Sequence, residues 1–151
     1  MHSRVSARPS VAAFALVLGA ASACSSSPVT EVVGFTASPL VTTQTSAGVY
    51  DVDVRTSPQP PVVGLTQAQL VVKDHATGRP VDGLSIGVVP WMPAMGHGTS
   101  LVPTVSAGGD GVYTIDQLSL FMAGEWELRL SFERPDGGDG HDTANPAFDV
   151  P

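Results

Sequence analysis

The chain has 151 residues, with 14 acidic residues against 7 basic ones and a formal net charge of −7. An anionic surface argues against nucleic acid as a partner and against membrane contact through a basic patch. A single cysteine excludes a disulfide within the chain, and this length suits one domain of ordinary size.

The N-terminal segment has the features of an export signal. Arg4 and Arg8 give it a positive start, and the apolar run VAAFALVLG at 11–19 is too short to span a membrane. Cys24 follows small residues at the end of this run. We therefore expect residues 1–23 to be a signal peptide.

The surroundings of Cys24 resemble the lipobox of bacterial lipoproteins, which implies that Cys24 carries a lipid anchor in the cell envelope. Ala21 departs from this pattern, because those lipoproteins usually have leucine there. Ala21 and Ala23 also suit ordinary signal cleavage, which would leave a soluble periplasmic or secreted protein. In the lipoprotein interpretation, Ser25 favours the outer membrane, since it replaces the aspartate associated with inner-membrane retention.

Residues 24–47 are rich in Ser, Thr and Pro and are predicted to be a tether that holds at most one early strand. The ordered domain is expected at 48–151, where apolar and polar residues alternate with a period of two. This alternation predicts strands within 50–55, 67–72, 84–88, 101–106, 112–115, 118–122, 126–133 and 147–150.

The fold class follows from these short elements. No window has apolar residues at helical spacing over three turns, and 13 prolines and 16 glycines interrupt the chain. About seven short strands, with turn signals roughly every 8 to 12 residues, are typical of an all-β, antiparallel immunoglobulin-like β-sandwich.

Two methionines and a histidine lie close together in the segment PWMPAMGHG: Met92, Met95 and His97. The preceding strand delivers this loop to one pole of the predicted sandwich. If each later connection reverses the chain, Met122 arrives at the same pole. The same reasoning places His75 and His141 at the far pole.

The donor atoms of this pole indicate a soft metal. Thioether sulfur together with imidazole suits Cu(I) better than zinc, calcium or magnesium. Pro90 and Pro93 fix the backbone angles around Met92, and Gly96 and Gly98 let the chain turn tightly beside His97, so the loop can hold its donors before metal arrives. The sequence therefore predicts a Cu(I) site with Met92, Met95, His97 and Met122 as ligands.

Several segments together resemble the YtkA-like and FixH-like family of small exported bacterial β-sandwiches. They are the export signal, WMPAMGHG after a strand, GVY after a Gly-rich turn, and FMAGEWEL before the penultimate strand. The resemblance covers residues 67–150 and implies copper handling in the envelope by the same four ligands. The ligand types are similar to those of periplasmic Met/His copper chaperones, although this chain lacks a His-x-Met pair near its C-terminus.

Core packing is the alternative role for the methionines, because methionine fills cores and packs on aromatic rings such as Trp91 and Trp126. Under that interpretation the chain is a structural or protein-interaction module without metal. Under the copper interpretation it is a non-catalytic module that captures or passes Cu(I), and its partner is a copper donor or acceptor protein of the envelope.

Other constellations carry less. The acidic stretch with Asp136, Asp139 and Asp142 lacks the ligand spacing of an EF-hand and reads as a solvated hairpin loop. Glu125 and Glu127 are expected to face outward, and Arg129 is expected to pair with one of them. No Ser-His-Asp or Cys-His set suggests nucleophilic catalysis, so we expect no enzyme activity.

Overall fold

A computed structural model of the chain describes residues 34–137 and 141–151. The predicted signal peptide, the predicted lipidation site at Cys24 and Asp139 lie outside these residues. Within the described ranges, no helix is long and apolar enough to cross a membrane.

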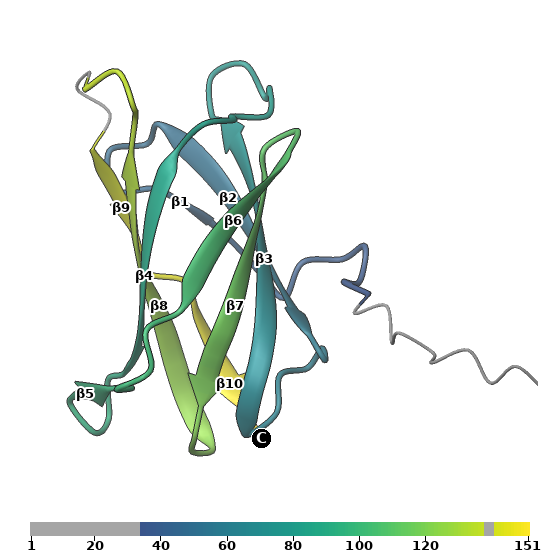
Figure 1. Cartoon of the computed structure of the whole chain (residues 1–151), viewed down its shortest axis with the longest axis vertical. Coiled ribbons are helices and arrows are strands. Elements are labelled where there is room, and N and C mark those ends of the chain that lie inside the picture. The colour runs from purple at the N-terminus through teal and green to yellow at the C-terminus, as the bar shows by residue number, and fades with distance from the viewer. Residues whose placement is uncertain (1–33, 138–140) are drawn as a thin grey trace, which may run out of the picture. The chain divides into compact units, whose positions relative to one another are not determined.

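The described residues form ten β-strands in two antiparallel sheets, which pack as a sandwich (Figure 1). The first sheet has the order β1 (Val41–Gln44), β2 (Tyr50–Ser57), β3 (Gly64–Asp74), β7 (Val112–Leu120), β6 (Thr104–Gly109). The second has the order β10 (Ala147–Val150), β8 (Gly124–Glu133), β4 (Ser85–Met92), β5 (His97–Gly98), with β9 (Asp142–Ala144) also paired to β8. The predicted fold class is confirmed.

The core lies between the two sheets and follows from the two-residue period. Every second residue of β2 and β8 is buried, because successive side chains of a strand point to opposite faces. Both sheets contribute, and the largest fully buried side chains are Trp126, Tyr50, Tyr113, Phe132, Leu70 and Ile115.

Strand β7 is continuous, whereas the sequence predicts two separate strands there. Ile115 and Leu118 are both fully buried although they are three residues apart, which breaks the period of two. Gln117 lies between them with a φ of 60°, and the pairing with β3 shifts register between Thr66 and Ala68. A β-bulge therefore resets the alternation within one strand.

Three strands were not placed by the alternation of the sequence. Strand β1 lies inside the segment predicted to be a tether and pairs with β2 from Val41↔Val54 to Gln44↔Asp51, so the sandwich takes in residues before Gly48. Strands β5 and β9 have only two and three residues. Such short elements carry too little alternation to be recognised.

The molecule has two contrasting ends. One end holds the loop after β4, strand β5, and the turn between β7 and β8 (Figure 1). We call this end, defined by residues 92–98 and 121–124, the methionine pole. The other end, where β3 and β6 finish and β2 and β7 begin, is the opposite pole.

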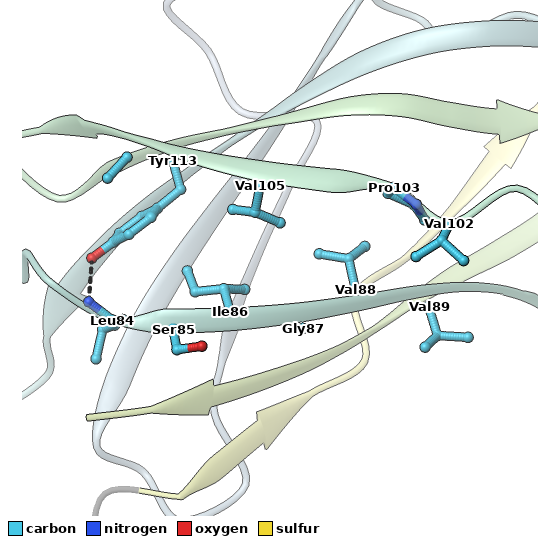
Figure 2. A pocket seen from close by; sticks show the side chains of 11 residues that line it. Leu84, Ser85, Ile86, Gly87, Val88, Val89, Val102, Pro103, Val105 and Tyr113 are labelled. Carbon is cyan, nitrogen blue, oxygen red and sulfur yellow. Dashed lines mark hydrogen bonds between the residues drawn. The ribbon is translucent and has the colours of Figure 1, made fainter. Parts of the chain in front are cut away.

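A groove of about 540 Å³ lies between β4 and the segment that leads into β6 (Figure 2). Its walls are mainly apolar, with Ile86 and Val88 on β4 facing Val105 of β6. Tyr113 lies at one end and bonds to the Leu84 amide. None of the predicted metal ligands lines this groove.

Candidate metal centre

The loop after β4 folds back on itself and pairs His97 with Met92. The amides of Met95 and Gly96 both donate to the Met92 carbonyl oxygen, at 3.1 and 3.0 Å. Strand β5 then pairs with β4 through Trp91↔Gly98 and Met92↔His97. Directly paired residues of antiparallel strands point to the same face of the sheet. Since Met92 points into the sandwich, His97 projects toward the same side.

Gly98 permits this close pairing. A Cβ atom at this position would lie 2.5 Å from the Pro90 carbonyl oxygen and 3.5 Å from the Trp91 ring. Any larger residue would push β5 away from β4. The glycine after His97 therefore sets how near the imidazole lies to the end of the sandwich.

Met92 is part of the core in this structure. Its side chain is only 4% exposed, and it packs among buried apolar residues. Its Cε methyl packs close to Gly124, where an added Cβ atom would lie only 2.8 Å from it. The core-packing role thus describes Met92 as it stands, and its sulfur would have to turn outward to bind a metal at the surface.

The turn after β7 reaches the methionine loop through an aromatic side chain. The ring of Phe121 stacks on His97, with 5.8 Å between centroids and 12° between planes. Phe121 also meets Trp126 edge-on at 5.3 Å. The indole N–H of Trp126 donates to the Met122 carbonyl oxygen at 2.9 Å. Two segments distant in sequence are therefore joined at the methionine pole.

The other three predicted ligands are accessible. Met95 is 53% exposed, Met122 is 38% exposed, and His97 is exposed. The Nδ1 atom of His97 lies 3.3 Å from the Gly98 carbonyl oxygen. A carbonyl oxygen can only accept, so this contact suits the tautomer with its proton on Nδ1, in which Nε2 is the nitrogen that can bind a ligand.

The donor chemistry of the described residues narrows the type of metal. Among residues 34–137 and 141–151, no three His, Cys, Asp or Glu side chains gather closely enough to hold a metal ion. These residues therefore contain no cluster of three imidazole, thiolate or carboxylate ligands. The methionine pole presents thioethers and one imidazole, which fit Cu(I) in type. Of the four predicted ligands, Met95, His97 and Met122 are exposed at this pole, whereas Met92 is buried.

The outer face beside the pole is occupied by an ion pair. Arg129 bonds to Glu127 at 2.7 Å, as the sequence predicts for one of the two glutamates. The guanidinium of Arg129 also lies 4.1 Å from the centre of the Trp91 ring, a cation–π contact. Arg129, Glu127 and Trp91 thus interact with one another on the outer face, and none of them belongs to the predicted ligand set.

The opposite pole holds the other two histidines of the described residues, His75 and His141, and one acidic residue that differs from expectation. His75 lies in an exposed turn beside Asp51, and His141 lies 3.7 Å from Glu133. Asp142 is buried rather than solvated, and it accepts bonds at 2.8 Å from the Ala47 and Thr143 amides. Although burial alone raises the pKa of Asp142, hydrogen bonds hold it below its ordinary value. Asp142 thus ties a loop to β9.

At the methionine pole, the sequence did not reveal the roles of Phe121 and Trp126. Both lie in the segment FMAGEWEL, which contributed to the family resemblance. An aromatic residue directly before a turn was the available signal. The alternation of the strand could not reveal that its ring stacks on a histidine from another loop.

Comparison with known proteins agrees with this fold. The YtkA-like family matches residues 44–131. No curated protein sequence matches the chain significantly. A solved DUF4426 family protein from Pseudomonas aeruginosa PAO1 is similar with a TM-score of 0.51 at 14% identity, over 72% of this chain and 96% of that chain.

Two structures of FetP from uropathogenic Escherichia coli strain F11 are also similar. The copper-bound form of a variant has a TM-score of 0.46 at 8% identity, over 75% of this chain and 93% of that chain. The as-isolated protein has a TM-score of 0.44 at 7% identity, over 68% of this chain and 87% of that chain. Similarity at this level does not extend to binding residues. The family match covers more than half of the sequence, and on that basis this chain belongs to the YtkA-like family.

Proposed function

We propose that this chain is a non-catalytic Cu(I)-binding module of the cell envelope, which captures or passes the ion at the methionine pole. The observation that carries the proposal is the stack of Phe121 on His97. This contact places the histidine of one loop beside the turn that carries Met122. The single imidazole and the accessible thioethers thus lie at the same end of the sandwich.

The charges of the pole suit a monovalent soft ion. Thioethers and a neutral imidazole add no charge, so the ion keeps its own, and the carboxylate of Glu127 is already paired with Arg129. The overall charge of −7 raises the local concentration of cations around the molecule. In this scheme the net negative charge attracts cations of any kind, and the thioether and imidazole donors select Cu(I) among them.

The exposure of the donors suits transfer rather than storage. Met95 and Met122 stand at the surface, where a second protein can reach a bound ion. Thioethers are neutral, exchangeable ligands, and His97 would be the anchoring nitrogen donor. The partner in this scheme is a copper donor or acceptor of the envelope, and a lipid on Cys24 would hold the module at a membrane.

A competition titration tests the proposal. The chain from Cys24 onward, carrying Cys24→Ala so that no thiolate competes, is titrated against a coloured Cu(I) chelator under anaerobic, reducing conditions. We expect the parent to withdraw one equivalent, and His97→Ala and Met95→Leu to withdraw much less. His75→Ala is the matched control, because it removes an exposed imidazole at the opposite pole. No withdrawal by the parent would refute the copper function.

Exposed apolar side chains favour a second function, the docking of a partner protein without metal. Met95, Phe121 and Met122 belong to the methionine pole, Leu101 lines a shallow pocket together with Phe121, and Leu65 pairs with Ser119 just before the turn. Methionine-rich surfaces adapt to different partners. Under this alternative, His97→Ala would leave metal content unchanged and would only slightly weaken binding of the partner protein.

A further inference from the structure

Phe121 is an aromatic residue that folding alone does not explain. Its side chain is 41% exposed, whereas the aromatic side chains of Trp126, Tyr113 and Phe132 are almost wholly buried. Burial in the core is therefore not what its ring mainly provides. Its ring contacts are a stack on His97 and an edge contact with Trp126.

The Phe121 ring packs against a buried residue of the core, Trp126. Trp126 has no exposed surface, and it lies near the start of β8, a strand with β10 on one side and β4 on the other, where Phe148 of β10 pairs with it. Its indole N–H also fixes the backbone of Met122, the next residue after Phe121. The edge-to-face geometry, with 83° between the rings, is a preferred arrangement for aromatic pairs. The position of the Phe121 ring is thus set by the core.

His97 has weaker support of its own. It lies in a strand of two residues, its side chain is exposed, and its Nδ1 bond to the Gly98 carbonyl is long at 3.3 Å. An exposed side chain on so short an element samples several rotamers unless packing restrains it. The nearly parallel Phe121 ring provides that packing.

We propose that Phe121 is a positioning residue of the metal site: its ring holds the His97 imidazole in one orientation before the ion arrives. This inference rests on the proposed function, in which His97 is a ligand. Phe121 itself does not bind the metal. Groups that orient a metal-binding histidine lower the ordering cost of binding. Removal of a hydrogen-bonding partner that does so weakens metal affinity by about 10- to 100-fold, and a stacked ring should act in the same direction.

Paired substitutions test the inference in the same Cu(I) competition assay. Phe121→Leu keeps an apolar side chain but removes the flat ring, so we expect Cu(I) affinity to fall about tenfold or more. Phe121→Tyr keeps the ring and should restore affinity. Val89→Ala removes an apolar side chain, 54% exposed, from the outer face of β4 and should leave affinity unchanged.

A double-mutant cycle separates positioning from a general structural effect. If Phe121 acts through His97, Phe121→Leu should have no further effect on affinity in a chain that already carries His97→Ala. Proton NMR of the metal-free chain gives a second readout. The imidazole protons of His97 should be shifted by the Phe121 ring current in the parent and in Phe121→Tyr, but not in Phe121→Leu.

The outcomes distinguish failure of the Cu(I)-binding function from failure of the positioning role of Phe121. If the parent does not withdraw Cu(I), the proposed function fails, and with it the metal-positioning role of Phe121. If the parent binds Cu(I) and Phe121→Leu binds it equally well, the copper function stands and the positioning role is wrong. Equal losses from Phe121→Leu with and without His97 would also overturn it, because the ring would then act by another route.

Discussion

The two poles of the sandwich are held together in different ways. At the opposite pole, the Tyr113 hydroxyl donates to the Val81 carbonyl oxygen at 2.8 Å and accepts from the Leu84 amide at 3.0 Å. Arg134 donates to the Tyr50 hydroxyl at 2.9 Å. These bonds join strands β7 and β2 of the first sheet to the β3–β4 connection and to the residue after β8, so the opposite pole is closed by polar contacts.

The methionine pole is closed by aromatic and apolar packing instead. Phe121 bridges His97 and Trp126, and Met92 fills the space next to Gly124. Polar contacts use up donors and acceptors, whereas apolar packing leaves the imidazole and thioethers free. Both ends thus support the sandwich, but among the described residues only the methionine pole leaves an imidazole and thioethers exposed together.

Removing the anchor of the methionine pole should have the largest effect. Trp126→Ala deletes a fully buried indole together with its bond to Met122, and we expect a loss of about 3 to 5 kcal/mol in the free energy of unfolding. Urea denaturation measures it. Trp91→Ala, which removes a partly exposed indole from the outer face, should cost clearly less. Similar losses from both would mean that Trp126 is no special anchor.

Breaking the closure of the opposite pole should have a moderate effect. Tyr113→Phe leaves the Val81 carbonyl and the Leu84 amide without their partner, which should cost about 1 to 3 kcal/mol in the free energy of unfolding. Cu(I) affinity should not change, because the methionine pole is intact. A large loss of Cu(I) affinity would contradict the separation of the two poles.

The same substitution should also change how stability depends on pH. Burial raises the pKa of Tyr113 above its ordinary value of 10.0. The folded chain therefore favours the neutral hydroxyl, so this contribution is complete below about pH 10 and is lost as pH rises through the folded-state pKa. Unfolding midpoints between neutral and alkaline pH should fall less steeply for Tyr113→Phe than for the parent.

A substitution at Gly98 should have the smallest effect on stability while still reaching the ligands. The added methyl of Gly98→Ala would meet the Pro90 carbonyl oxygen, so β5 must move away and carry His97 with it. We expect weaker Cu(I) binding with a loss of about 1 kcal/mol in unfolding free energy, since few residues are affected. Gly108→Ala is the control, because its nearest atoms lie at an ordinary 3.5 Å. Unchanged Cu(I) affinity in Gly98→Ala would show that this pairing does not position the site.

Much of the sandwich could be predicted because a period of two marks strands that bury one face. Strand β8 follows this pattern from Trp126 to Phe132, and its inward side chains are buried as the sequence predicts. The period fails where the backbone departs from regular pairing. The positive φ at Gln117 is such a case, since the bulge shifts which residues face inward.

The candidate site was predictable mainly to the level of which segments meet. Chain reversal places the Met92 loop and Met122 at one end, and the structure has them there. The inward direction of Met92 follows from the same period of two, because position 92 continues the buried set at 88 and 90. Sequence could not reveal the stack of Phe121 on His97, which depends on side-chain orientation.

The groove between β4 and β6 also bears on aggregation. Strand β5 pairs only with Trp91 and Met92, so the rest of β4 has no neighbour on that side within the described sheet. Open strand edges invite pairing with other chains. Pro90 lies within β4 and Pro103 directly precedes β6, and a proline offers no backbone donor. The groove thus carries a proline on each side, which limits how far a foreign strand can extend along either edge.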